Sequence, residues 1–195
     1  YVVPWTPYSV FSVRRIDTVA DFDSLPIRAF NQTVTTLIQS LGASPVKIPL
    51  KDVKSAFEQG KLEGRFASLS VGEDSQIWDY APYLNDLRIW IPKEIVVMNK
   101  RAYDQLDEKT KAAIDKASIK AERNGWIETK ERVETDLASL KDGGIVYNQP
   151  SSSLLRELDR INQRMTKAWV EQDEKQNGGI YRAYREAQRQ SQTTH

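Results

Sequence analysis

The chain of 195 residues is long enough for one domain with appendages, and a hydrophobic fraction of 39% is enough to bury a core. A formal net charge of +1, from 28 basic and 27 acidic side chains, gives no overall positive field for binding nucleic acid or an anionic membrane. The longest aliphatic run, Ile95–Met98, is far shorter than the roughly 20 apolar residues of a membrane-spanning helix.

Short strands alternate with short helices in the first half of the chain, which is the rhythm of an α/β fold. The predicted strands are Val10–Val13, Ile27–Phe30, Pro45–Pro49, Phe66–Val71, Leu87–Ile91 and Glu94–Asn99, the last two separated by Pro92. The predicted helices run from a cap at Asp17 to Phe22, from a cap at Asn31 to a stop at Gly42, from Lys51 to Gln59, and through Ile77, Trp78 and Tyr80.

The second half of the chain predicts long helices. From Asp107 a stretch without a strong breaker predicts one helix of about 34 residues, roughly 50 Å long. Ile119, Trp126, Val133 and Leu140 recur every seven residues along it, which favours a buried core stripe over a partner-binding groove. After a strand at 144–148, the serines at 151–153 begin another helix, whose expected buried face is Leu154, Leu158, Ile161, Met165 and Trp169.

The residue types of the commonest catalytic sites are missing from this sequence. It has no cysteine, and its only histidine is the C-terminal His195, which we expect to be mobile or part of a tag. Ser-His-Asp and Cys-His arrangements and His-ligated metal sites therefore cannot form, although enzymes that use carboxylates, Lys or Tyr stay open.

The sequence also predicts no metal and no cofactor. The acidic residues Glu63, Glu73 and Asp74 lack the ligand spacing of a calcium loop. A glycine-rich phosphate loop of the Walker or Rossmann type is absent. Tyr1 does not begin a signal peptide, so we expect any targeting segment to have been removed.

Ligands of open α/β sheets bind where the strands end, which makes Arg28 the first candidate binding residue. Arg28 stands at the end of a predicted strand, just before the helix capped by Asn31, whose free backbone N–H groups favour an anion. Its guanidinium could hold a carboxylate through two parallel hydrogen bonds. A surface ion pair is the alternative interpretation of this arginine.

A second group of candidates surrounds the turn at Gly64. The segment 62–68 places this turn before a strand, and the small Ser68 leaves room for a ligand. Phe66 could form an apolar wall of a pocket, as could Trp5 and Trp90, although aromatic residues at such positions belong to a core more often.

Several segments in this order resemble the substrate-binding proteins of TRAP transporters, the DctP-type periplasmic receptors. The resembling segments are Asp21–Arg28, Leu41–Val46, Gln59–Gly60, Leu62–Gly64, Tyr83–Leu84 and Val96–Lys100, followed by the long helix and the strand and helix after it. The resemblance covers most of the chain up to about residue 169.

The resemblance implies a non-enzymatic receptor that binds a small organic acid in a cleft between two lobes and delivers it to a TRAP permease in the membrane. In the family, an arginine at the position of Arg28 pairs with the carboxylate of the ligand. The implied location is periplasmic. The implied fold is an α/β lobe of the periplasmic-binding-protein type, with a mainly parallel sheet, a long connecting helix and C-terminal helices.

The family's receptors are longer, and nearly a whole first lobe would precede Tyr1. The expected parts here are an α/β ligand-binding lobe (1–106), a lobe-spanning helix (107–142) and a late strand with C-terminal helices (143–195). Strands near Val10 and Val97 would then lie beside first-lobe strands, so without that lobe we expect a free sheet edge and an exposed apolar helix face. The expected consequence is self-association, pairing with the missing lobe, or rearranged termini that cover this surface. After Gly64 the family usually has a polar or acidic residue and often Asn-Pro, whereas this chain has Arg65–Ser68.

Two other classes of function stay open at this point. A carboxylate-only α/β hydrolase would need a paired acidic site with raised pKa values in its main pocket. A non-catalytic partner-binding module would instead show Phe66, Trp90 and the strand ends in a closed core without a cavity.

Overall fold

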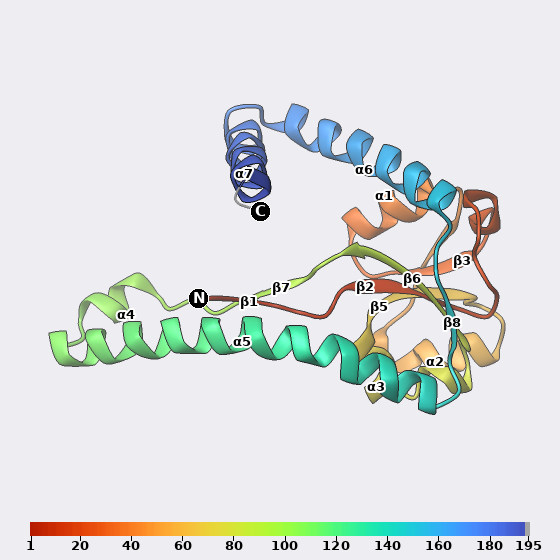
Figure 1. The fold of residues 1–195 in the computed structure, drawn as a ribbon, viewed down its shortest axis with the longest axis horizontal. Helices are drawn as coiled ribbons and strands as arrows, with labels where there is room; N and C mark the ends of the chain where they lie inside the picture. Colours follow the sequence, from red (N-terminus) through yellow and green to blue (C-terminus); the bar gives the residue numbers. More distant parts are fainter. Residues whose placement is uncertain (194–195) are drawn as a thin grey trace.

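The computed structural model describes residues 1–193, so His195 lies outside the described residues (Figure 1). One six-stranded sheet, in the order β4-β3-β5-β2-β6-β8, forms its centre. The strands are β2 (Tyr8–Ser12), β3 (Pro26–Ala29), β4 (Ser44–Lys47), β5 (Gly64–Ser68), β6 (Tyr83–Trp90) and β8 (Val146–Asn148). Only β2 runs against the others, because it pairs antiparallel with β5 and β6 while the remaining pairs are parallel. The predicted mainly parallel sheet is therefore confirmed.

Helices cover both faces of this sheet. The α-helices are α1 (Gln32–Ser40), α2 (Val53–Glu58), α3 (Leu69–Asp74), α4 (Lys100–Asp104), α5 (Glu108–Asp142), α6 (Ser152–Gln172) and α7 (Gln176–Thr193), and the 3-10 turns are η1 (Val19–Phe22), η2 (Leu50–Asp52) and η3 (Ile77–Asp79). One core cluster joins the sheet to α1 and α6 through residues such as Ile38 and Leu154. The other joins it to α2, α3 and the end of α5 through Phe57 and Leu140. We name this two-sided body the lobe.

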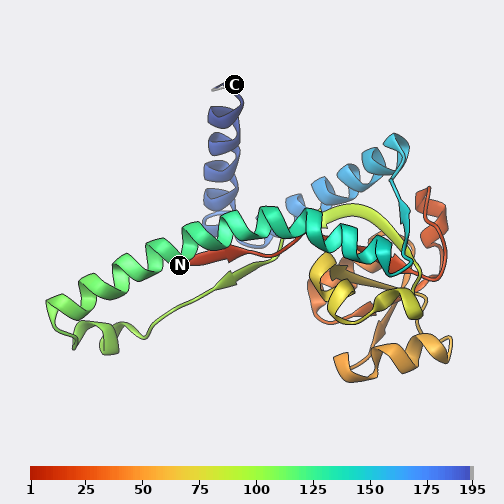
Figure 2. The same ribbon diagram turned by 60° about the horizontal axis from the view of Figure 1, so that its bottom comes forward.

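A narrower arm extends from the lobe. It consists of the antiparallel ribbon of β1 (Val2–Pro4) and β7 (Lys93–Ile95), the first half of α5, and α4 (Figure 2). The ribbon lies directly on α5: Thr129 Oγ1 donates to the Pro4 carbonyl at 2.9 Å. A Cβ atom at Gly125 would come within 2.0 Å of Val3 Cγ1, so this close contact requires glycine. Among the described residues, no helix has the length and apolar character to span a membrane.

Several predicted element boundaries are wrong. The strand predicted over Phe66–Val71 ends at Ser68, because the Ser68 hydroxyl accepts a hydrogen bond from Val71 N and caps α3. The helix expected through Ile77 is only a 3-10 turn after α3. The first short helix is capped at Thr18, not Asp17, through the side chain of Asp21.

The long helix is confirmed, but its predicted core stripe is wrong over half of its length. Leu140 is fully buried and Val133 is partly buried, whereas Ile119 is 72% exposed and Trp126 is 44% exposed. The first half of α5 lies on the arm, beyond the lobe that would have to cover it. Burial of the predicted apolar face of α6 likewise decreases along the helix, from the buried Leu154 to the exposed Trp169.

The prediction that strands near Val10 and Val97 have free edges is also wrong for Val10. This residue is fully buried in β2, which pairs on one side with Phe66 and on the other with Asn85. Val97 follows β7 and is 82% exposed.

Candidate ligand-binding site

Four of the five candidate residues from the sequence lie at one edge of the sheet, and the fifth, Phe66, lies inside β5 and contacts Trp90. Parallel strands β3, β5 and β6 end there, close to Arg28, at Ser68 and at Trp90 respectively. Since β2 runs the other way, it begins at this edge, and its first residue Tyr8 pairs with both Ser68 and Trp90. Trp5 precedes β2 at the same edge. Carboxyl ends of parallel strands are where α/β sheets bind ligands.

Arg28 is half-buried and partly committed to the fold. Its Nε donates to the Ile48 carbonyl at 2.9 Å, and its guanidinium lies over the Phe30 ring, 5.6 Å from the centroid. The side chain makes no ion pair with any Asp or Glu in the part of the chain that the structure describes. The terminal Nη atoms therefore remain available, and the surface ion pair considered from the sequence does not form.

A cavity of about 570 Å³ adjoins Arg28. Lys47, at the end of β4, lines it together with Phe30 and the first turn of α1. The Asn31 side chain already accepts from Val34 N at 2.8 Å and so caps one of the free amides of α1. Two cationic side chains and a helix N-terminus make this cavity suited to an anion.

Burial and charge both act on Arg28. Partial burial lowers the pKa of Arg28, and the neighbouring positive charge of Arg65 lowers it further. Both effects disfavour the cation, and an anion placed against the guanidinium would relieve both.

Aromatic rings of β2, β5 and β6 gather at the part of this edge formed by those three strands. The Tyr8 and Trp90 rings lie 5.0 Å apart, and the Phe66 and Trp90 rings lie 5.2 Å apart, both in tilted contact. Phe66 is buried in the core, while Tyr8 and Trp90 are only partly buried. Trp90 also borders an apolar pocket of about 530 Å³ between α1, β6 and α6. The strand ends are therefore not sealed by a closed core.

Trp5 and Ser68 are joined by a hydrogen bond. The Trp5 indole N–H donates to Ser68 Oγ at 2.8 Å. Next to this pair, Thr6 Oγ1 lies 3.2 Å from Ser70 Oγ, which in turn donates to the buried carboxylate of Asp136 on α5. These contacts connect the start of β2, the start of α3 and the long helix.

Two residues of this edge escaped the sequence interpretation. Arg65 is opposite Arg28 in the β3–β5 register and is only 4% exposed. Tyr8 lies near both arginines, and burial raises the pKa of its hydroxyl. Arg65 carried one signal in the sequence, since it is the single charged residue in the strand segment Gly64–Ser68.

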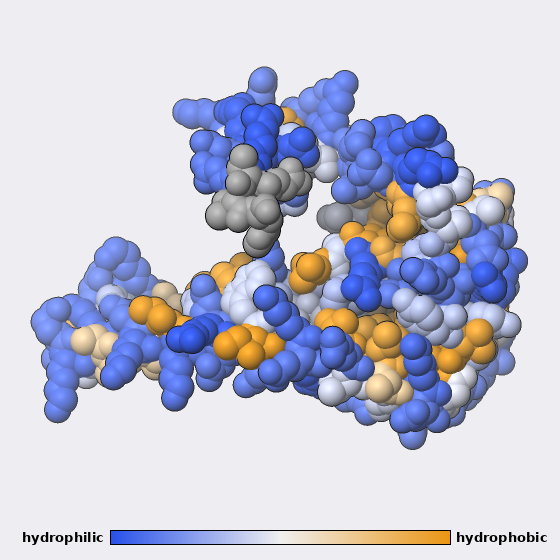
Figure 3. Space-filling model, in the orientation of Figure 1, coloured by the Kyte–Doolittle hydropathy of each residue, from blue (hydrophilic) through white to orange (hydrophobic). Residues whose placement is uncertain are grey.

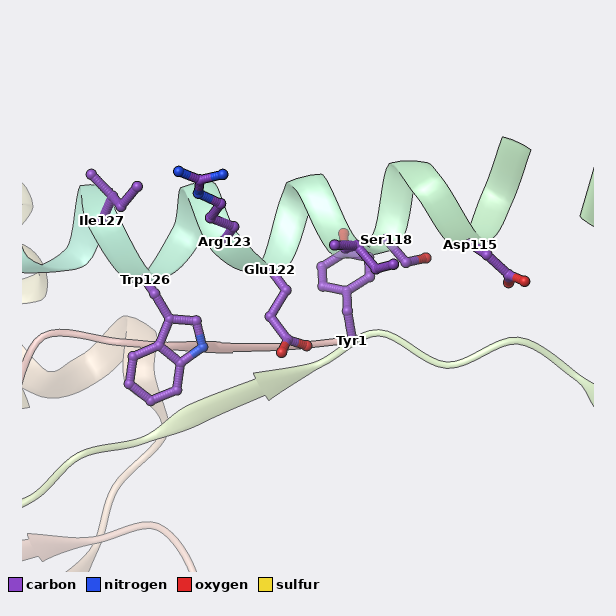
Figure 4. A pocket seen from close by; sticks show the side chains of 8 residues that line it. Tyr1, Asp115, Ser118, Glu122, Arg123, Trp126 and Ile127 are labelled. Atoms are coloured by element: carbon purple, nitrogen blue, oxygen red, sulfur yellow. The ribbon is translucent and has the colours of Figure 1, made fainter. Parts of the chain in front are cut away.

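A separate hollow lies on the arm. It measures about 820 Å³ and is bordered by Tyr1 and one side of α5. Figure 4 shows Glu122 and Trp126 directed from α5 toward the ribbon, and Glu122 Oε2 accepts from Val2 N at 2.9 Å. Apolar patches are exposed along the arm (Figure 3). No cluster of three or more metal-ligating side chains occurs within residues 1–193.

The lobe is of the periplasmic-binding-protein type. It has the mainly parallel sheet of that class, the long helix α5 extends beyond it, and cationic side chains lie where the strands end. The chain belongs to the DctP family, described as bacterial extracellular solute-binding protein, family 7, whose sequence model matches residues 8–175. The resemblance inferred from the sequence is thereby confirmed.

Two solved receptors from Bordetella pertussis are similar along nearly the whole chain. DctP6, an extracytoplasmic solute receptor binding pyroglutamic acid, is 29% identical with a TM-score of 0.89. DctP7, described in the same words, is 28% identical with a TM-score of 0.87. In each case the match covers 95% of this chain and 62% of the receptor.

A curated relative is YiiZ of Salmonella typhimurium, itself described as uncharacterised. It is 28% identical over 140 residues, which are 68% of this chain and 41% of YiiZ. The chain thus spans less than two thirds of the length of each of these three proteins.

Proposed function

We propose that the protein containing this chain is the solute receptor of a TRAP transporter. It binds a small organic acid at the edge where β3, β5 and β6 end, and it delivers the acid to a permease in the membrane. The location proposed with this role is the periplasm. The observation that carries the proposal is Arg28, which reaches this edge without an acidic partner among the described residues.

The chemistry of Arg28 supports a carboxylate ligand. Because Nε is held by the Ile48 carbonyl, the guanidinium is restricted in orientation, and its two Nη groups donate to no acceptor among the described residues. Two parallel N–H···O bonds to one carboxylate fit this edge, and a lysine could not make them. Ser68, Trp5, Trp90 and Phe66 are proposed as the polar and apolar surroundings of the acid.

The related receptors support the same class of ligand. DctP6 and DctP7 are both described as binding pyroglutamic acid, a small cyclic carboxylate. Pyroglutamate is therefore the first acid to test on this protein.

The arm supports a second lobe as the partner of this one. Ile95, Val97, Ile119 and Trp126 are exposed on the arm, and exposed apolar surface of this kind marks an interface. We propose that a further lobe covers the arm and closes the cleft, either in the same protein or after association. The division into 1–106, 107–142 and 143–195 is part of this proposal.

A carboxylate-only hydrolase finds less support. It needs a carboxyl group whose pKa is raised, so that the group can act as a general acid. The carboxyl groups with a shifted pKa among the described residues are Asp21 and Asp107, and hydrogen bonds lower the pKa of each.

The test is calorimetry on the full-length protein with pyroglutamate, after a thermal-shift screen of small acids. We expect Arg28→Lys to lose about tenfold to a hundredfold in affinity, because a hydrogen bond to a charged group contributes about 1.5–3 kcal/mol. Arg15→Lys is the matched control, since Arg15 is exposed and pairs with Asp17 away from the edge. Unchanged affinity in Arg28→Lys would remove Arg28 from the site, and a protein that binds no small acid would refute the receptor function.

A further inference from the structure

Arg65 is a buried cation that the fold does not neutralise. Only 4% of the residue is exposed, and its Nε is buried without a hydrogen-bond partner. Within residues 1–193, its side chain makes no hydrogen bond or ion pair. Other arginines of the chain differ: Arg88, for example, is more exposed and pairs with Asp86 at 3.1 Å.

The position of Arg65 directs it to the ligand edge. Arg65 is the β5 partner of Arg28, and side chains paired in register on adjacent parallel strands project from the same face. The two guanidinium groups are close enough for the charge of Arg65 to lower the pKa of Arg28 and to act on the hydroxyl of Tyr8. Three consecutive strands, β3, β5 and β2, therefore bring Arg28, Arg65 and Tyr8 together.

Two unneutralised guanidinium groups side by side are unfavourable in the empty protein. Removing a charged group from water is costly unless hydrogen bonds and an opposite charge compensate it. Like charges on neighbouring strands add repulsion to this cost. An acceptor that enters with the ligand would remove both penalties. A fold that keeps two adjacent arginines without an acidic partner of its own is therefore suited to bind an anionic ligand.

We propose that Arg65 is a second ligand-binding arginine, and that it selects small carboxylates bearing a second oxygen acceptor, either a ring carbonyl or a second carboxylate. Arg28 binds the first carboxylate through its two Nη groups, so the donors of Arg65 are left for the second acceptor. The inference rests on the proposed receptor function and goes further, because it defines the class of acid.

The experiment compares paired acids that differ at the second acceptor. 3-Oxocyclopentanecarboxylate is paired with cyclopentanecarboxylate, and glutarate with pentanoate, because each pair shares ring or chain size and one carboxylate and differs at the second acceptor alone. Affinities are measured by calorimetry for the full-length wild-type protein, Arg65→Gln and Arg28→Gln. We expect Arg65→Gln to lose about tenfold or more for an acid with the second acceptor and under about threefold for its partner, as expected for loss of a charged hydrogen bond. Arg28→Gln weakens both members of a pair.

The outcomes separate this inference from the proposed function. If Arg65→Gln weakens both members equally, or neither, while Arg28→Gln still weakens both, the role of Arg65 is refuted and the receptor function stands. If the wild-type protein binds none of the four acids or other screened acids, the receptor function fails and the inference fails with it.

A second variant protects the test against misfolding. Arg65→Lys keeps the charge but loses the planar donor set, so we expect an intermediate loss that is again confined to acids with the second acceptor. Denaturant unfolding of each variant without ligand is measured alongside. A variant that unfolds more easily yet keeps wild-type discrimination between paired acids would show that Arg65 is only structural.

Discussion

Leu140 and Ile119 lie on the same helix and in the same heptad stripe, yet Leu140 is fully buried in the lobe and Ile119 is 72% exposed on the arm. The lobe packs helices on both faces of a sheet, so a helix laid against it loses its apolar side to the core. The arm offers α5 only a two-stranded ribbon. The comparison shows that periodicity identifies the apolar side of a helix, whereas the neighbouring elements decide whether that side is covered.

The largest expected difference between the two regions comes from truncating this stripe. Leu140→Ala should destabilise the lobe by about 2–5 kcal/mol, because it opens a cavity in a closed core. Ile119→Ala should change the free energy of unfolding by less than about 0.5 kcal/mol, because the side chain is already exposed. Urea unfolding followed by circular dichroism measures both. Comparable losses for the two variants would mean that the arm is covered as completely as the lobe.

A smaller effect is expected where the ribbon meets α5. Gly125→Ala would place a Cβ within 2.0 Å of Val3, so we expect β1 to be displaced and its amides at Val2 and Val3 to exchange hydrogen faster. Overall stability should fall by about 1–3 kcal/mol. Gly179→Ala is the matched control in α7, where a Cβ would meet no atom within 4 Å. If Gly125→Ala leaves amide exchange unchanged in β1, the ribbon does not lie on the helix as described.

The smallest expected effect concerns the stability of the lobe at acidic pH. Hydrogen bonds from the Thr18 and Asp17 backbones lower the pKa of Asp21 below its ordinary value of 3.8. A lowered folded-state pKa contributes stability above pH 3.8 that is lost as the pH falls through the folded value. Asp21→Asn should remove this part of the pH dependence and lower neutral-pH stability by at most about 1 kcal/mol. Unfolding midpoints measured over roughly pH 2 to 5, the range of carboxyl titration, test this prediction. A variant with the wild-type dependence of stability on acidic pH would contradict the role of Asp21 in the cap.

Local signals predicted much of the fold correctly. Asn31 caps α1 through its side chain, Asp107 caps the long helix and Ser151 caps α6, each by accepting a hydrogen bond from a backbone amide a few residues on. Gly42 has the positive φ of 82° that ends α1. Such signals act within one turn of the chain, so the sequence carries them directly.

The errors arise where distant segments meet. Ser68 could not be recognised as the end of β5, because its hydroxyl serves both α3 and Trp5, which lies far away in the chain. The isolation of Arg65 depends on which strands flank β5, and sheet order is not written in any single segment. The exposure of Trp126 likewise depends on how far the lobe extends along α5. Arg28 was found from the sequence because strand end and helix cap adjoin there.

The hydrogen bonds from Trp5 to Ser68, between Thr6 and Ser70, and from Ser70 to Asp136 all lie at the junction of arm and lobe. They join the segment between β1 and β2 to α3, and α3 to α5, at the same place along the long helix. The segments cannot slide past one another there without breaking several buried polar contacts. We therefore expect the junction to move as one rigid body. A change of angle between arm and lobe would then displace the segment before β2 and the helix α5 together.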